Sequence, residues 1–244
     1  MSTSGEVGRI DLDPARRRDV LLPDVPRPDG RIGEAIVRYT AGERTNHWIV
    51  ALAFILAALS GLALFDPSFF WLSTLFGGGP WTRVLHPFIG LLMVVAFVFL
   101  AANVHSGNRM TAADWRWIAQ WRDVIGNRED RLPEVGRYNA GQKLVFALQI
   151  LCLTVLLVTG FLFWRPYFAG NFSIGVIRAA VLLHAIFAFV LIMTIIVHIY
   201  AGIWVRGSVR AMTRGTVTPG WAWKHHRAWF REVLRAARPR SGTD

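Results

Sequence analysis

The chain has 244 residues, of which 53% are hydrophobic, yet it carries 27 Lys and Arg against 16 Asp and Glu, for a net charge of +11. The apolar and basic residues are segregated along the sequence, as is typical of a membrane protein. The single cysteine, Cys152, excludes an internal disulfide, an iron–sulfur cluster and covalent haem attachment through a Cys-x-x-Cys-His motif.

The N-terminal part of the chain is rich in Pro, Asp and Arg and has little that can form a core. We expect residues 1–43 to be a disordered cytoplasmic extension. No cleavable signal peptide is visible, because no apolar stretch follows the basic run Arg16-Arg17-Arg18 until Trp48.

Four stretches without Asp, Glu, Lys or Arg follow, and a helix of about 20 apolar residues crosses a bilayer core. These stretches are Trp48–Phe65, Val84–Val104, Leu144–Trp164 and Ala179–Val205. Lipid leaves a single span no other way to satisfy its backbone than an α-helix. The sequence therefore predicts an all-α, multi-pass membrane protein with a bundle of four transmembrane helices in residues 44–205.

The distribution of Lys and Arg predicts the orientation of these helices. Residues 1–46, 105–143 and 206–244 hold 24 of the 27 basic residues, and the two other connections hold only Arg83, Arg165 and Arg178. Basic loops stay in the cytoplasm, so we expect both termini to be cytoplasmic and the protein to lie in a bacterial inner membrane. Topology and anionic lipid explain the basic charge, and no nucleic acid partner is needed.

Two cytoplasmic segments combine Trp with Arg in a way that favours helices lying in the membrane interface. The first begins at Asp114, the expected cap, and continues through Trp115, Ile118, Trp121 and Ile125. The second belongs to the basic tail, residues 206–244, and contains Trp221, Trp223 and Trp229.

Four histidines lie in or at the ends of the apolar spans, where a polar ring is costly and usually functional. His47 and His198 are placed near the cytoplasmic face, and His86 and His184 near the outer face. His184 and His198 share one helix and lie about 21 Å apart along its axis. Since neutral imidazole is an axial ligand of haem iron, the four side chains are candidate ligands of two haem b groups.

Small residues one turn after each histidine leave room for a flat ligand beside the helix. They are Ala51, Gly90, Ala188 and Gly202. The rival ligand His105 is followed at this spacing by Arg109, so we interpret His105 as an interfacial histidine. We expect His225 and His226, beyond the last span, to be solvated or at the headgroups.

In these motifs the chain resembles the membrane cytochrome b (gamma) subunit of respiratory formate dehydrogenases, over residues 44–234. The matching words are Arg44-Thr45-Asn46-His47-Trp48, Leu85-His86-Pro87-Phe88-Ile89-Gly90, Tyr138-Asn139-Ala140-Gly141-Gln142-Lys143, Val158-Thr159-Gly160, Trp164-Arg165-Pro166-Tyr167-Phe168-Ala169, Leu183-His184-Ala185, His198-Ile199-Tyr200, Trp204-Val205 and Lys224-His225-His226.

The resemblance implies an electron-transfer subunit that carries no formate-oxidising site of its own. Electrons would come from the iron–sulfur (beta) subunit, and through it from the catalytic (alpha) subunit, and would reduce quinone near the inner face. His86 and His184 would hold the outer haem, and His47 and His198 the inner one. Asn139 and Gln142 would bind the quinone, since amides hydrogen-bond a carbonyl without adding charge; the alternative for Asn139 is a plain helix cap.

Other functions remain open on the sequence alone. A cytochrome b subunit of a membrane-bound hydrogenase shares the four-helix, two-haem plan. A haem-free membrane anchor and a carrier that relays protons through its histidines belong to different classes.

Overall fold

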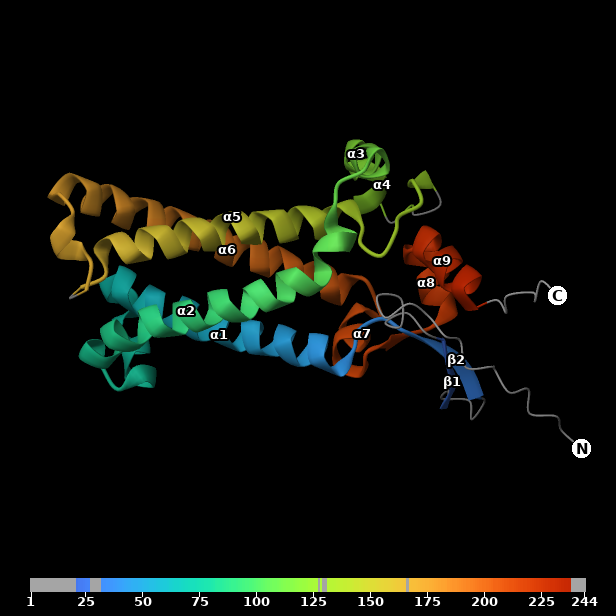
Figure 1. Cartoon of the computed structure of the whole chain (residues 1–244), viewed down its shortest axis with the longest axis horizontal. Helices are drawn as coiled ribbons and strands as arrows, with labels where there is room; N and C mark the ends of the chain where they lie inside the picture. Colours follow the sequence, from blue (N-terminus) through green and yellow to red (C-terminus); the bar gives the residue numbers. More distant parts are fainter. Residues whose placement is uncertain (1–20, 27–31, 127, 129–130, 166, 238–244) are drawn as a thin grey trace, which may run out of the picture. The chain divides into compact units, whose positions relative to one another are not determined.

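The computed structural model describes residues 21–26, 32–126, 128, 131–165 and 167–237. In chain order the elements are β1 (Leu21–Pro26), β2 (Ile32–Val37), α1 (Ala41–Phe65), η2 (Pro67–Phe76), α2 (Gly79–Val104), η3 (His105–Asn108), α3 (Ala112–Ala119), α4 (Trp121–Ile125), α5 (Ala140–Phe163), η5 (Ala169–Asn171), α6 (Ile174–Trp204), α7 (Ser208–Arg214), β3 (Thr216–Val217), α8 (Pro219–His225) and α9 (Arg227–Ala237) (Figure 1). The chain divides into two compact units, each described in turn.

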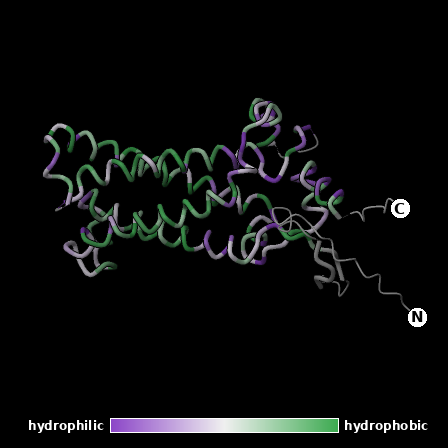
Figure 2. The backbone as a smooth tube through the Cα atoms, in the orientation of Figure 1, coloured by the Kyte–Doolittle hydropathy of each residue, from purple (hydrophilic) through white to green (hydrophobic). Residues whose placement is uncertain are grey.

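Four long helices, α1, α2 with η3, α5 and α6, are long and apolar enough to cross a membrane. Hydrophobic residues cover most of their length in Figure 2. The prediction of four membrane-spanning helices is therefore confirmed. Helix α1 begins at Ala41, earlier than the predicted span, because Thr40 and Glu43 cap it: the Glu43 carboxylate accepts hydrogen bonds from Thr40 N at 2.8 Å and from Thr40 Oγ1 at 2.9 Å.

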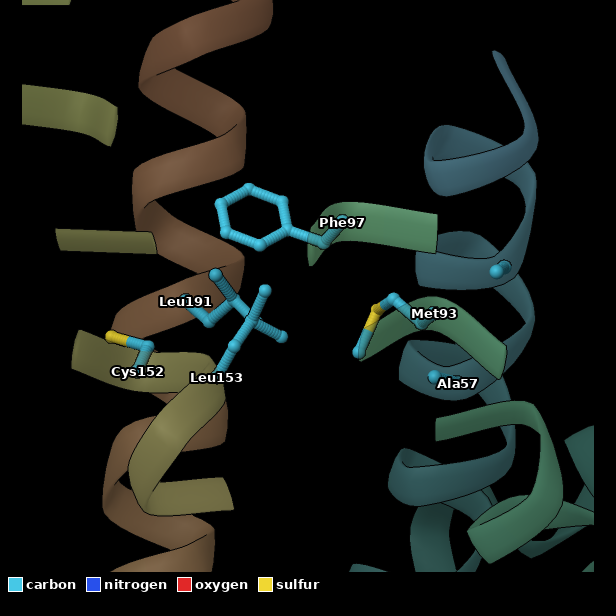
Figure 3. Close-up of a cluster of buried hydrophobic side chains, with 7 residues drawn as sticks. Ala57, Met93, Phe97, Cys152, Leu153 and Leu191 are labelled. Atoms are coloured by element: carbon cyan, nitrogen blue, oxygen red, sulfur yellow. The ribbon is translucent and has the colours of Figure 1, made fainter. Parts of the chain in front are cut away.

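The membrane unit comprises Thr45–Ser106 and Leu144–Ala201. Its centre is an apolar cluster to which all four helices contribute, shown in Figure 3: Ala53, Ala57, Met93, Phe97, Cys152, Leu153 and Leu191. Many bulky apolar side chains of the same helices point outward; Val98 and Phe99, for example, are 59% and 64% exposed. So much exposed apolar surface is unfavourable in water and suits contact with lipid.

The second unit contains the described residues of Met1–Arg44, Gly107–Lys143 and Gly202–Asp244. Its three strands form an antiparallel sheet in the order β1-β2-β3, with Ile36 paired to Val217 and Val37 to Thr216. The helices α7 to α9 pack on this pairing around a buried core of Ile36, Ala211, Val217, Ala222, Trp229 and Val233.

Part of the predicted N-terminal extension therefore differs from the expectation of disorder. Residues 1–20 and 27–31 lie outside the described residues, but β2 pairs with β3 and Ile36 is fully buried. Ile36 finds its apolar partners in the C-terminal tail. The tail differs as well, since Trp229 belongs to the core while Trp223 is exposed as expected of an interfacial residue.

Arg38 lies at the centre of the second unit and is 1% exposed. Its guanidinium stacks over the Trp229 ring at 4.5 Å from the ring centre, and its Nη2 donates to the carbonyl of Arg137. The same Nη2 lies 3.4 Å from His226 Nε2, while His226 Nδ1 donates to the Gly136 carbonyl at 2.8 Å. These contacts join the N-terminal strands, the loop before α5 and the C-terminal helices.

His226 is buried, which corrects the prediction that it is solvated. Burial lowers the pKa of His226 well below its ordinary value, and the neighbouring Arg38 charge lowers it further. A neutral ring fits the hydrogen bonds, because Nδ1 donates to a carbonyl and Nε2 is then free to accept from Arg38.

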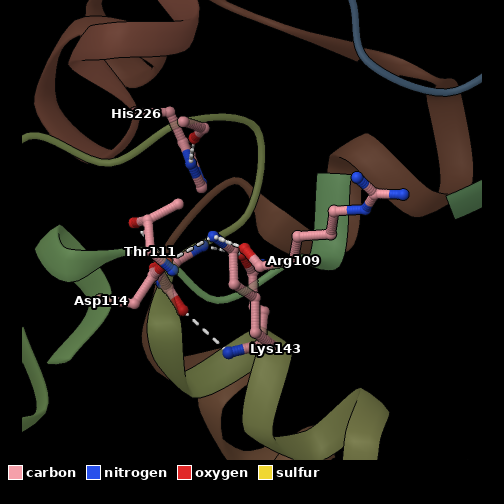
Figure 4. A network of polar contacts seen from close by, with 8 residues as sticks. Arg109, Thr111, Asp114, Lys143 and His226 are labelled. Atoms are coloured by element: carbon pink, nitrogen blue, oxygen red, sulfur yellow. Dashed lines mark hydrogen bonds and ion pairs between the residues drawn. The ribbon is translucent and has the colours of Figure 1, made fainter. Parts of the chain in front are cut away.

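A buried ion pair holds α3 to the start of α5 (Figure 4). Lys143 Nζ lies 2.7 Å from Asp114 Oδ2, donates to the Arg109 carbonyl at 2.9 Å, and both side chains are less than a tenth exposed. Asp114 also accepts from Thr111 N and Oγ1, so the cap of α3 is Thr111, and the prediction that Asp114 is the cap is corrected. Burial opposes ionisation of Asp114, but hydrogen bonds from Lys143 and Thr111 lower its pKa overall.

We predict that Lys143→Met destabilises the second unit by about 3–5 kcal/mol, because it leaves the Asp114 carboxylate buried without a cation. The free energy of unfolding can be followed by denaturant-dependent proteolysis of the purified chain in detergent. The matched control is Arg128→Met, which removes the exposed ion pair of Arg128 with Asp123 at 3.4 Å and should cost less than about 1 kcal/mol. Equal effects of the two substitutions would show that the buried pair is not structural.

Candidate functional site

The four candidate histidines form two pairs within the membrane unit. The ring centres of His47 from α1 and His198 from α6 are 6.3 Å apart, with the rings inclined at 47°. Those of His86 from α2 and His184 from α6 are 6.4 Å apart, inclined at 69°. The structure thus brings together the residues that the sequence paired by depth.

The separation within each pair fits two imidazoles on opposite sides of one metal ion. A metal–imidazole bond is about 2 Å long and the ring centre lies about 1 Å beyond the bonded nitrogen, so the two ring centres should be roughly 6 Å apart. In the described part of the chain, no group of three or more His, Cys, Asp or Glu side chains gathers that could hold an ion. Two axial protein ligands suit an iron whose remaining ligands come from a porphyrin.

Helix α6 contributes one histidine to each pair and sets the distance between them. His184 and His198 are 14 residues apart on this uninterrupted helix. At about 1.5 Å per residue, they lie roughly 21 Å apart along its axis. One helix therefore carries two sites at different depths in the membrane.

Glycines provide free space or close approach at these rings. A Cβ atom added at Gly90, one turn after His86, would meet no atom within 4 Å, which is consistent with room for a flat ligand. A Cβ at Gly61 would lie 3.2 Å from His86 Cε1, and one at Gly160 would lie 3.5 Å from His184 Cε1. The His86 and His184 rings therefore pack directly against the backbones of α1 and α5.

Two buried hydroxyl groups contact the His86 and His184 rings, and neither was predicted from the sequence. Ser60 Oγ lies 2.9 Å from His86 Nδ1, and Thr159 Oγ1 lies 2.9 Å from His184 Nδ1. The available signal was a hydroxyl residue followed by glycine, 25 or 26 residues before each of these two histidines. The other pair differs, because His47 Nδ1 is buried and has no hydrogen-bond partner among the described residues.

Asn139 and Gln142 cap the start of α5 reciprocally. Asn139 Oδ1 accepts from Gln142 N, and Gln142 Oε1 accepts from Asn139 N, both at 2.9 Å. The side-chain oxygen of Asn139 therefore acts as a helix cap, which is the alternative that the sequence left open. Within the described residues neither amide nitrogen donates a hydrogen bond, so both remain available as donors to a ligand.

The remaining histidines lie apart from the two pairs. His105 is exposed in η3, and its Nδ1 lies 2.9 Å from the Ala102 carbonyl. His225 packs against Trp221, and His226 belongs to the Arg38 network. Neither His105 nor His226 lies in one of the two histidine pairs of the described structure.

Comparison with known proteins identifies relatives over most of the chain. Residues 38–215 match the family model described as prokaryotic cytochrome b561. The chain is 48% identical to the formate dehydrogenase cytochrome b556(fdo) subunit of Escherichia coli strain K12, over 83% of this chain and 95% of that protein. It is 40% identical to the nitrate-inducible cytochrome b556(Fdn) subunit of the same strain, over 82% and 93%, and 41% identical to the formate dehydrogenase cytochrome b556 subunit of Haemophilus influenzae, over 82% and 84%.

Proposed function

The chain belongs to the prokaryotic cytochrome b561 family, and from that membership and its two histidine pairs we propose that it is a di-haem electron-transfer subunit. A cytochrome b of this kind binds haem b within the membrane. The proposed role is to carry electrons from a formate dehydrogenase across the membrane to quinone, in line with the relatives' names.

The observation that carries this proposal is the presence of two imidazole pairs, each of which takes one of its histidines from helix α6. We assign His86 and His184 to the outer haem and His47 and His198 to the inner haem. These histidines would hold the two haem groups, and each haem would supply an iron that accepts and releases one electron. The apolar helices would exclude water from the space between the two sites.

The direction of transfer rests on the distribution of basic residues. With both termini in the cytoplasm, α1 and α5 begin at the cytoplasmic face, and the His86 and His184 pair lies toward the opposite face. In a bacterium the corresponding membrane is the inner membrane. Electrons that enter outside and reduce quinone inside would move negative charge across the bilayer.

The proposed donor is a separate polypeptide. A chain with a single cysteine, buried between helices, provides no ligand set for an iron–sulfur cluster. The proposed partners are the iron–sulfur (beta) subunit and, through it, the catalytic (alpha) subunit of a formate dehydrogenase. The loop between α5 and α6 provides an outer surface for such a partner: Arg165 is exposed and lines a hollow of about 420 Å³ with Ala169, Gly170 and Ile177.

The amides at the start of α5 are the proposed quinone-binding groups. Their oxygens are used by the helix cap, so their N–H groups are the atoms that would donate to a quinone carbonyl. Gln142 is exposed and Asn139 half-buried, which leaves the Gln142 amide accessible to a ligand. Because α5 begins at the cytoplasmic face in the proposed orientation, protons for the quinol would come from the cytoplasm.

We predict two haems per polypeptide in the purified chain and one after His86→Ala. Loss of one axial imidazole weakens the outer haem without touching His47 or His198. The pyridine haemochrome assay, referred to the protein concentration, measures this ratio. His105→Ala is the matched control and should retain both haems.

A ratio of one or zero in the unmodified chain would contradict the proposal. Zero would favour a haem-free membrane anchor. Loss of a haem in the His105→Ala variant would show that one of the assigned ligands is wrong.

We predict that Gln142→Leu slows quinone reduction while both haems remain reducible. This variant removes both the capping oxygen of α5 and the amide donor. A second variant, Gln142→Glu, is therefore needed as a control that separates the two effects. A Glu at this position keeps the capping oxygen and lacks the N–H group. The measurement is the rate at which a short-chain naphthoquinone reoxidises the reduced chain in stopped flow.

The two variants distinguish the roles of Gln142. Slow reoxidation in both identifies the amide N–H as the required group. A normal rate in Gln142→Glu with a slow rate in Gln142→Leu would leave Gln142 only the role of a helix cap.

A further inference from the structure

The hydroxyl groups beside the His86 and His184 rings donate to the backbone of their own helices. Ser60 Oγ lies 2.7 Å from the Leu56 carbonyl oxygen and 3.1 Å from that of Ala57. Thr159 Oγ1 lies 2.6 Å from the Val155 carbonyl oxygen and 3.3 Å from that of Leu156. A carbonyl only accepts, so the hydroxyl is the donor in these contacts.

The contact with each ring then has a defined direction. With its proton directed to the backbone, the hydroxyl oxygen can only accept, and the imidazole Nδ1 must donate along the 2.9 Å contact. A neutral imidazole has one N–H, so Nε2 of His86 and of His184 carries the free electron pair. Ser60 is fully buried and Thr159 is 4% exposed, so water does not compete for these hydrogen bonds.

The same arrangement occurs twice in the membrane unit. Helix α1 presents Ser60 and Gly61 to His86 of α2, and helix α5 presents Thr159 and Gly160 to His184 of α6. In each case the hydroxyl fixes Nδ1 and the glycine allows the Cε1 edge of the ring to approach the backbone. The ring is thus oriented from two sides before any ligand binds.

We propose that Ser60 and Thr159 are positioning residues of the outer haem site, which fix the tautomer and orientation of His86 and His184 so that Nε2 faces the iron. This inference rests on the proposed function, because it takes these histidines as haem ligands. Partners of the non-coordinating nitrogen orient a ligand and raise its basicity. The inner site lacks this arrangement at His47, whose Nδ1 has no partner among the described residues.

The consequence is an asymmetry between the two haems. A ligand that donates a hydrogen bond through Nδ1 gives more electron density to the iron, which favours the ferric form and lowers the reduction potential. Removing the acceptor should therefore raise the midpoint potential of the outer haem and weaken its binding. The inner haem should not change.

Ser60→Ala and the nearly isosteric Thr159→Val test this inference. The matched control is Thr194→Val in α6, since Thr194 is also buried and donates to the carbonyl four residues before it, at 2.7 Å, but is not hydrogen-bonded to a histidine among the described residues. The measurements are a potentiometric titration of each haem and the rate of haem transfer to excess apomyoglobin. We expect a positive shift of the outer potential and about tenfold or greater weakening of outer haem binding.

The conservative variants Ser60→Thr and Thr159→Ser keep an acceptor and should behave as the unmodified chain does. Thr159→Val preserves the test if Ser60→Ala fails to fold. If Ser60→Ala and Thr159→Val behave as Thr194→Val does in both measurements, the inference is overturned. The ligand assignment is tested separately, and it stands if His86→Ala removes the outer haem. If His86→Ala retains both haems, the ligand assignment fails and this inference fails with it.

Discussion

Each of the two nitrogens of an imidazole ring needs a partner, and inside a membrane no water is available to provide one. The arrangement of the four long helices follows from the protein groups that provide these partners. In the His86 and His184 pair, Nδ1 of each ring is hydrogen-bonded to a hydroxyl of the preceding helix, and the two ring centres are 6.4 Å apart. Each interaction crosses from one helix to another, so α1 is tied to α2 and α5 to α6. Helix α6 then joins the two halves, because it contributes to both pairs.

The membrane unit relies little on polar interactions elsewhere. Its core is a small apolar cluster from all four helices, and most of the remaining apolar surface is exposed, as lipid contact requires. The second unit has the opposite character: Arg38 and His226 are buried in contact with each other, and Asp114 and Lys143 form a buried ion pair. A buried charge is costly unless it is paired, so removing one partner should affect the second unit more than most apolar substitutions on its surface.

Residue patterns in the sequence predicted the helices of the membrane unit and the depths of its histidines. The four uncharged stretches predicted its helices, and the 14-residue spacing of His184 and His198 predicted that one helix would serve two depths. Ser60 and Thr159 were not predicted, because a hydroxyl in a helix ordinarily bonds its own backbone. The glycine that follows each of them does not by itself indicate a neighbouring ring. The β2–β3 pairing was missed because β3 has only two residues and lies about 180 positions from β2. His226 was misplaced because it stands in a basic segment that looked solvated, while its partners Arg38 and Gly136 are far away in sequence.

A spectroelectrochemical titration of the purified chain tests most directly whether it holds two haems at different depths. The absorbance of the reduced α-band, followed against potential, should resolve into two one-electron components of equal amplitude, one for each histidine pair. A single component, or no α-band on reduction, would contradict a chain in which His86 with His184 and His47 with His198 each hold a haem.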